Sequence, residues 1–264
     1  MSLPQDFLGR IIFIIKNYGQ SLLKGAGTTL LIAIVGTVIG CLIGFIVGII
    51  QTIPVSKRDN IVKKVILKIL KIIINIYVEV FRGTPMMVQA MFIYYGSAVV
   101  FGINMDMWVA AFFIVSINTG AYMAETVRGG ILSVSDGQTE GAKAIGMNHF
   151  QTMLYVILPQ ALKNIMPQIG NNLIINIKDT CVLSVIGTVE LFFATKSVAG
   201  TYYTFFEAYT VTMVMYLCMT VFFSKILRVM ERKLNGPENY SLSTTDTLAY
   251  TSGLLKYPSK KEVE

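Results

Sequence analysis

The sequence predicts an all-α membrane protein with about five transmembrane helices. The chain has 264 residues, of which 54% are hydrophobic and only 14% are charged, and its mean hydropathy is +0.63. Soluble domains carry about 25% charged residues, whereas several apolar runs here approach the ~20 residues of a membrane-crossing helix. The alternating ten-residue segments of a transmembrane β-barrel are absent from the sequence.

Charge and cysteine usage fit this class. We expect the net charge of +7 to lie on cytoplasmic loops and set the orientation, rather than to bind nucleic acid. Cys41, Cys181 and Cys218 lie in apolar stretches without metal-ligand spacing, which predicts small core residues. The single histidine, His149, has no companion ligands nearby, so no metal site is expected. Residues 1–24 carry charges and no small-residue cleavage site, so no cleavable signal peptide is expected.

The N-terminal part of the chain predicts an interfacial segment followed by the first span. Residues 1–24 are weakly amphipathic, which predicts a segment lying in the membrane interface. The first span covers about 26–50, and residues 51–64 form a lysine-rich loop expected in the cytoplasm. Four glycines recur on one face of this span and predict close helix contact; they are Gly36, Gly40, Gly44 and Gly48.

The second span contains a predicted break. A helix over about 61–82 ends at Arg82-Gly83-Thr84-Pro85, because proline lacks an N–H and restricts the residue before it. We expect residues 86–101 to complete that crossing. The third span covers about 107–129 and opens with Trp108, an interface anchor.

The C-terminal half predicts two more spans and a tail. The fourth span covers about 163–187, and 188–202 is expected to be an outer loop whose Glu190 and Lys196 are solvated or touch a partner. The fifth span covers about 203–226 and ends in basic residues. Residues 236–264 are polar and aperiodic, which predicts a loose cytoplasmic tail. This topology places the N-terminus outside and the C-terminus inside.

A polar island at residues 133–159 interrupts the apolar chain. Ser135 and Gln138 fit a capping box that starts a helix, and Gly146 suits the left-handed position that ends one. Glu140 and the small residues after it leave a slim helix of the kind that inserts into a groove of another protein.

A second short helix is expected after the glycine. Asn148 and Gln151 fit its N-terminal cap, and Pro159 is expected to limit it. The island is thus predicted to form a helix, a glycine elbow and another helix on the cytoplasmic side. The alternative is a re-entrant surface hairpin.

Polar residues follow one face of three predicted spans. Ionisable residues within spans indicate functional sites, and i, i+4, i+7 spacing places them on one helical face. The three stripes predict a single internal path suited to a zwitterion; they are Asn75, Glu79 and Arg82, then Asn118, Tyr122 and Glu125, then Asn172, Asn176 and Asp179.

Seven residues are candidate substrate contacts: Asn118, Tyr122, Asn176, Asp179, Thr180, Arg82 and Glu79. Asp179 is expected to hold an α-amino or basic group. Arg82 is expected to hold a carboxylate or to pair with Glu79, since buried charges are usually paired. Glu125 and Arg128 are expected to repeat such a pair near the inner surface.

Several motifs resemble the permeases of ABC transporters. Glu140-Gly141-Ala142, Gly146 and Leu158-Pro159 resemble their EAA loop, with Gly141 in place of the usual alanine. Four further stretches resemble the permeases for polar amino acids: FRGTP at 81–85, AETVRGGI at 124–131, YVILPQALKNIMP at 155–167 and IKDT at 177–180. The resemblance covers roughly residues 20–235.

The resemblance implies a type I importer permease domain over 25–235 in a bacterial plasma membrane, and no enzyme activity of its own. It implies an ATPase dimer that binds ATP and Mg²⁺, a second permease (identical or paralogous) and an extracellular amino acid-binding protein as partners. The chain itself has no GxxxxGK[ST] loop and is expected to bind no cofactor. The coupling residues implied are Glu140, Gly141, Ala142, Lys143, Ala144 and Gly146.

Other functions remain open from the residues alone. An ion-coupled carrier often has two matching broken helices, whereas this sequence shows one clear break, at 83–85, and no partner for it. The spans lack a Ser/His pair, a metal cluster or HExxH, which argues against a membrane enzyme. The stripes hold both charges and several amides, which favours glutamine or glutamate as substrate; basic amino acids and cystine are alternatives.

Overall fold

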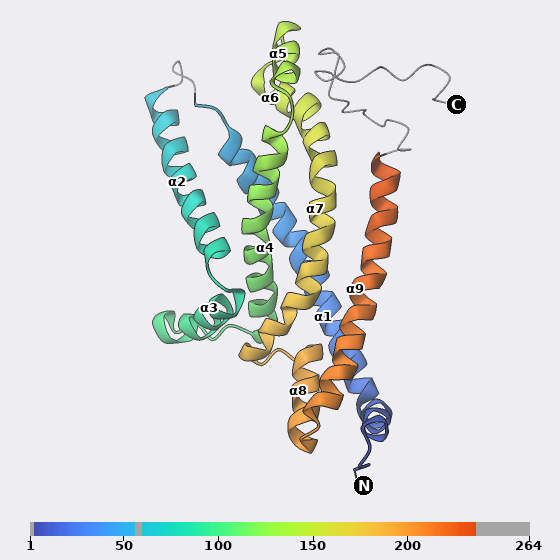
Figure 1. Ribbon diagram of the computed structural model, residues 1–264. Coiled ribbons are helices and arrows are strands. Elements are labelled where there is room, and N and C mark those ends of the chain that lie inside the picture. The colour runs from blue at the N-terminus through green and yellow to red at the C-terminus, as the bar shows by residue number, and fades with distance from the viewer. Residues whose placement is uncertain (1–2, 56–59, 236–264) are drawn as a thin grey trace, which may run out of the picture. The chain divides into compact units, whose positions relative to one another are not determined.

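The computed structural model describes residues 3–55 and 60–235, which form helices and no strand (Figure 1). The chain divides into two compact units, one ending at Leu227 and one starting at Arg228. The elements are α1 (Phe7–Thr52), α2 (Ile61–Gly83), α3 (Met86–Phe101), α4 (Met107–Leu132), α5 (Asp136–Ala144), α6 (His149–Gln151), the π-helical η1 (Thr152–Ile157), α7 (Leu158–Asp179), the 3₁₀ helix η2 (Thr180–Ile186), α8 (Leu191–Tyr202) and α9 (Phe205–Asn235). Within the second unit, Arg228–Asn235 form the last turns of α9; the predicted tail 236–264 lies outside the described residues.

The described part of the chain contains fewer candidate membrane spans than the five predicted. In the described part of the chain, three helices are long and apolar enough to cross a membrane, namely α1, α4 and α9. A fourth span arises if the segment His149–Ile186 and α8, bent by 55°, count as one broken span. Helix α2 does not qualify because it carries four lysines, Glu79 and Arg82 within 23 residues.

Helices α1 and α4 form the tightest contact of the first unit. The four glycines predicted to line a helix contact all face α4: a Cβ added at any of them would come within 3.0 Å of an α4 side chain. Their partners recur every fourth residue along α4 as well, and they are Val115, Thr119, Met123 and Val127. The predicted glycine contact is therefore confirmed.

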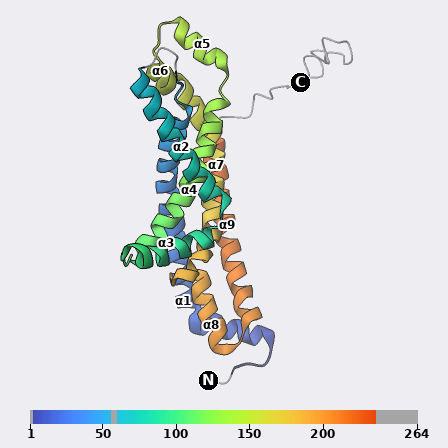
Figure 2. The ribbon, with the colours of Figure 1, turned by 90° about the vertical axis from the view of Figure 1, so that its left-hand side faces the viewer.

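Helix α1 also includes the segment that we expected to lie apart in the interface. It is continuous from Phe7 to Thr52, and Asp6 caps it by accepting a hydrogen bond from Gly9 N at 2.7 Å. Figure 2 shows its first turns at an angle to the rest of the helix. These turns pack against α8 and α9, and Arg10 forms a 2.9 Å ion pair with Glu207. Helix α1 is therefore continuous through residue 24, and its first turns share an apolar cluster with α8 and α9; their position in the membrane interface stays a prediction.

The break in the second predicted span lies where the sequence places it. Helix α2 ends at Gly83, Thr84 is extended, and α3 begins at Met86. However, α3 does not complete the crossing: it turns across the direction of α2 and packs on α4 and η2 (Figures 1 and 2).

The predicted outer loop at 188–202 is largely helical. It contains α8, which Glu190 caps by accepting hydrogen bonds from Phe192 N at 2.8 Å and Phe193 N at 2.6 Å. Glu190 also accepts from the Tyr216 hydroxyl at 3.1 Å and is fully buried, so the expectation of a solvated or partner-binding carboxylate is wrong. The expectation that every cysteine lies in the core is also wrong, because Cys218 on α9 is exposed.

Candidate functional site

Most residues predicted to contact substrate meet at a cavity of about 280 Å³. We call it the amide cavity; Thr84, Pro85, Met86, Asn118, Thr119, Tyr122, Asn172, Ile175, Asn176 and Asp179 line it. The α2–α3 break, α4 and α7 therefore supply its walls. Thr180 is not part of it: this residue is fully buried, and its hydroxyl donates to the Ile177 carbonyl at 3.0 Å.

Asparagine amides on the cavity wall tie the helices together. Asn176 Nδ2 donates to Thr37 Oγ1 of α1 at 2.7 Å and to Thr119 Oγ1 of α4 at 2.9 Å. Asn118 Nδ2 donates to Gln89 Oε1 of α3 at 2.8 Å. The spacing in the sequence places these asparagines on the cavity wall, but it does not show that their N–H groups donate hydrogen bonds to other helices.

Asp179 is the charged group of the amide cavity. It is the last residue of α7, and its side chain is exposed to the cavity. Among residues 3–55 and 60–235 it accepts no hydrogen bond and forms no ion pair. An unpaired carboxylate within a membrane protein is costly and indicates a role in binding.

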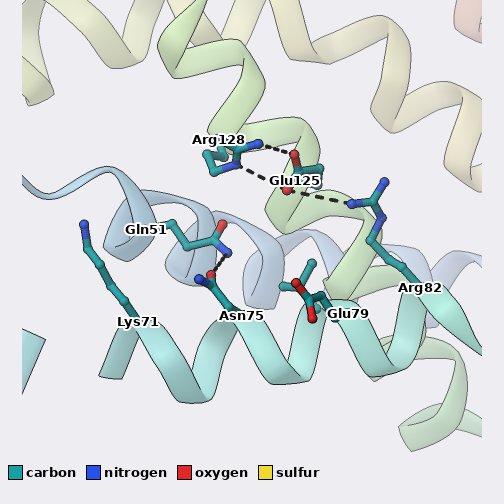
Figure 3. Close-up of a pocket in the computed structure, with 8 residues that line it drawn as sticks. Gln51, Lys71, Asn75, Glu79, Arg82, Glu125 and Arg128 are labelled. Carbon is teal, nitrogen blue, oxygen red and sulfur yellow. Dashed lines mark hydrogen bonds and ion pairs between the residues drawn. The ribbon is translucent and has the colours of Figure 1, made fainter. Parts of the chain in front are cut away.

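A second cavity of about 390 Å³ lies between α1, α2 and α4 (Figure 3). We call it the charged cavity; Gln51, Lys71, Asn75, Val78, Glu79, Arg82, Glu125 and Arg128 line it. Figure 3 shows Glu125 between the two arginines. Arg128 Nε donates to Glu125 Oε2 at 3.2 Å, and an Arg82 nitrogen lies 3.8 Å from the same oxygen.

These contacts confirm one predicted ion pair and replace the other. Glu125 pairs with Arg128 as expected. Arg82 turns to Glu125 instead of Glu79, and the Glu79 carboxylate has no ion pair within the described part of the chain. The polar stripes divide between two cavities, and the single internal path stays a prediction. The Arg82 guanidinium, which lines the charged cavity, lies 5.8 Å from the centre of the Tyr122 ring, which lines the amide cavity.

The predicted glycine elbow is present. Gly146 has φ +84, its N–H donates to Lys143 O at 3.0 Å, and Met147 N donates to Ala142 O at 3.1 Å. This pair of bonds is the Schellman motif that ends a helix at a left-handed residue. At the other end of α5, Ser135 occupies the cap position, but its side chain makes no capping hydrogen bond.

The second helix starts as predicted and then continues. Asn148 and Gln151 form a reciprocal capping box with bonds of 2.9 and 3.0 Å. Pro159 does not limit the helix, because the π-helical turn η1 shifts the hydrogen-bond register before it and Leu158 N donates to Met153 O. The chain therefore passes from the elbow directly into α7.

The elbow presents polar and apolar side chains to its surroundings. Of the six predicted coupling residues, Glu140, Gly141, Lys143, Ala144 and Gly146 are exposed, whereas Ala142 is 5% exposed on a helix that packs on η1. Sequence reasoning missed Ile145 and Phe150, which are 76% and 72% exposed. Their large apolar side chains within an otherwise polar segment are the sequence feature that could have identified them.

Apolar spans that enclose polar cavities, joined by an exposed helix–glycine–helix elbow, define a membrane transport permease. Residues 62–236 match the family of binding-protein-dependent transport system inner membrane components, and the chain belongs to that family. This match, together with the relatives described next, confirms the all-α permease fold and the resemblance to ABC permeases of polar amino acids. Members of this class are multi-pass membrane subunits of ABC importers that work with a separate ATPase and a binding protein.

Individual relatives agree. The chain is 40% identical over 160 residues to the glutamine transport system permease protein GlnP of Escherichia coli K12, covering 60% of this chain and 73% of GlnP. A crystal structure of an amino acid ABC transporter with histidines aligns with a TM-score of 0.74 at 35% identity, covering 87% of this chain and 99% of that one. The MetNI methionine ABC transporter in an inward-facing conformation aligns with a TM-score of 0.68 at 19% identity, covering 82% and 97% of the two chains, and supports the fold alone.

Proposed function

We propose that this chain is the membrane subunit of an importer that moves glutamine inward, driven by ATP that a partner subunit hydrolyses. The observation that carries the proposal is the amide cavity, in which a carboxylate and asparagine amides lie between helices of a membrane domain. A volume of about 280 Å³ suits one small polar molecule. The 40% identity to a glutamine permease supports glutamine as the substrate.

The charges of the two cavities match the ends of an amino acid. Asp179 is placed to receive the α-ammonium group. Arg82, stacked on Tyr122 at the wall of the amide cavity, is placed to attract the α-carboxylate. Glu79 offers a second acceptor in the charged cavity, where an ammonium group leaving the amide cavity would be drawn. Asn118 contacts the substrate side chain, and Asn176 fixes the wall.

The elbow is the proposed attachment point of the ATPase. Glu140, Gly141, Lys143, Ala144 and Gly146 would contact the ATPase surface, with Ile145 and Phe150 as apolar anchors. Ala142 has a different role in this proposal: its buried methyl group seats α5 on η1. ATP and Mg²⁺ would bind to the ATPase dimer, and this chain would bind no cofactor.

The remaining assembly follows from the same reasoning. A second permease, identical or paralogous, completes the membrane part, and an extracellular binding protein delivers glutamine. We place the N-terminus outside and the C-terminus in the cytoplasm of a bacterial cell. The lysine-rich start of α2 and the elbow lie at the same end of the first unit (Figure 1), which supports this orientation by the positive-inside rule.

Binding of glutamine to the purified permease–ATPase complex, without the binding protein, tests the proposal. Asp179→Asn should weaken glutamine binding about tenfold or more, because a hydrogen bond to a charged group contributes ~1.5–3 kcal/mol. The control is Lys163→Gln, which changes an exposed residue of the same helix outside the cavity. Equal affinity of Asp179→Asn and the unmodified complex would remove the cavity from the mechanism. Tighter binding of arginine or cystine than of glutamine would overturn the substrate.

A further inference from the structure

Gln89, which no motif singled out, occupies the centre of the α2–α3 break. It lies in the first turn of α3 and is 6% exposed. Its side-chain nitrogen Nε2 lies 2.9 Å from Phe81 O, 2.9 Å from Thr84 O and 2.8 Å from Thr84 Oγ1. The amide nitrogen is thus surrounded by three oxygens.

The break itself explains why these oxygens need a donor. In a continuous helix Phe81 O would accept from the N–H of residue 85, but that residue is proline and has none. Thr84 O would accept from Val88 N, which instead donates to Pro85 O at 3.0 Å. Gln89 supplies the missing donor to both carbonyls. A buried carbonyl without a hydrogen-bond donor costs roughly several kcal/mol in an apolar environment.

This arrangement fixes the orientation of the Gln89 amide. Its nitrogen must face the three oxygens, so its oxygen Oε1 faces the other way and can only accept. It accepts from Asn118 Nδ2 at 2.8 Å, and the same nitrogen lies 3.4 Å from Phe81 O. If the Asn118 amide were rotated by about 180°, its Oδ1 would face Gln89 Oε1 and Phe81 O, which are both acceptors. Asn118 is therefore held with its nitrogen toward the break.

The polar atom that Asn118 has left for the cavity is its oxygen. Asn118 lines the amide cavity, and within the described ranges its Oδ1 makes no hydrogen bond. Asn172 is similar: its nitrogen donates to Gln168 O at 3.0 Å, which leaves its oxygen. The part of the cavity wall formed by Asn118, Asn172 and Asp179 therefore offers hydrogen-bond acceptors.

We propose that Gln89 is a positioning residue that determines specificity, because it locks Asn118 with its acceptor toward the substrate. The group bound there must then donate, as the carboxamide nitrogen of glutamine does and the side-chain carboxylate of glutamate does not. This inference rests on the proposed function and deepens it: the substrate is the amide, and the acidic amino acid is rejected by unpaired acceptors.

The test compares the dissociation constants of glutamine and glutamate for the purified permease–ATPase complex. The unmodified complex should prefer glutamine. Gln89→Met removes the 2.8 Å acceptor of the Asn118 nitrogen and leaves only its 3.4 Å contact with Phe81 O. Asn118 is then no longer fixed in one orientation, so the preference should fall by up to about tenfold, the equivalent of one hydrogen bond of ~1.4 kcal/mol. Gln20→Met, on an exposed glutamine of α1, should leave the preference unchanged.

A second variant keeps the test decisive if Gln89→Met fails to assemble. Asn118→Ala removes the proposed acceptor and leaves the Gln89 donor to the break in place, so the preference for glutamine should fall about as far as in Gln89→Met; an unchanged preference would overturn the inference. A ratio of two ligands is not moved by a general loss of stability.

The outcomes separate the inference from the proposed function. If Asp179→Asn weakens glutamine binding as expected while Gln89→Met keeps the ratio, the inference is wrong and the proposed function stands. If the unmodified complex binds no glutamine, both are wrong.

Discussion

At the residue scale, one buried amide joins three helices. Asn176 of α7 donates to Thr37 of α1 and Thr119 of α4, and Thr119 lies on the glycine-lined α1–α4 contact beside Gly40. Hydrogen bonds between membrane helices are worth about 0.6–2 kcal/mol each. Asn176 therefore fixes the position of α7, and with it the position of Asp179 one turn further on.

Removing this amide should loosen α7. We expect Asn176→Ala to lower the melting temperature of the purified complex, since it removes two interhelical bonds worth about 1–2 kcal/mol together. Asn171→Ala is the matched control, because Asn171 lies on the same helix and is exposed. Thermal unfolding followed by tryptophan fluorescence measures both; equal melting temperatures would show that the network adds nothing to stability.

The sequence could place these residues but not assign their atoms. The i, i+4, i+7 spacing correctly puts Asn172, Asn176 and Asp179 on one cavity wall. The partners that consume the asparagine nitrogens lie 29 residues away for Asn118 and as many as 139 for Asn176. No local sequence pattern encodes such pairs. The sequence alone therefore cannot show which amide atoms bond to other helices and which face the cavity.

At the element scale, local chemistry predicted the interruptions better than the continuous helices. Pro85 and Gly146 each impose a backbone constraint, and the break and the elbow lie where they stand. Pro159 does not end its helix, because the π-helical turn η1 shifts the hydrogen-bond register just before the proline, which lacks an N–H. Helix α8 was missed because its cap is Glu190, a residue type that is not among the preferred caps.

The elbow makes a prediction about coupling. Gly146→Leu should strain the left-handed position by about 1–2 kcal/mol and displace α5, so ATP hydrolysis should proceed with reduced glutamine uptake. Gly146→Asn should retain coupling, because asparagine tolerates this conformation. Gly137→Ala, on the same helix but outside the proposed coupling residues, controls for added bulk, since a Cβ there would meet only Ser135 Oγ, at 3.5 Å. The measurement is the ratio of transported glutamine to released phosphate in proteoliposomes; an unchanged ratio for Gly146→Leu would exclude the elbow from coupling.

At the scale of the whole molecule, α4 is a candidate for crossing the membrane from one side to the other. Its 26 residues span about 39 Å at 1.5 Å per residue, enough to cross the hydrocarbon core. The segment before it carries Asn104 and the segment after it opens α5 with Asp136, and both residues are exposed. We therefore expect these two positions to face opposite compartments.

Labelling at these positions decides the orientation. In a background without the three native cysteines, Asn104→Cys should react with a membrane-impermeant maleimide on intact cells, and Asp136→Cys should not. Inverted vesicles should reverse the pattern, because the elbow must reach an ATPase in the cytoplasm. Asp136 is chosen because it lies outside the proposed coupling residues, so a bound ATPase need not shield it. Glutamine uptake by each variant confirms that the labelled protein is folded. Reaction of Asp136→Cys on intact cells would place the elbow outside, where no ATP-hydrolysing subunit could act on it.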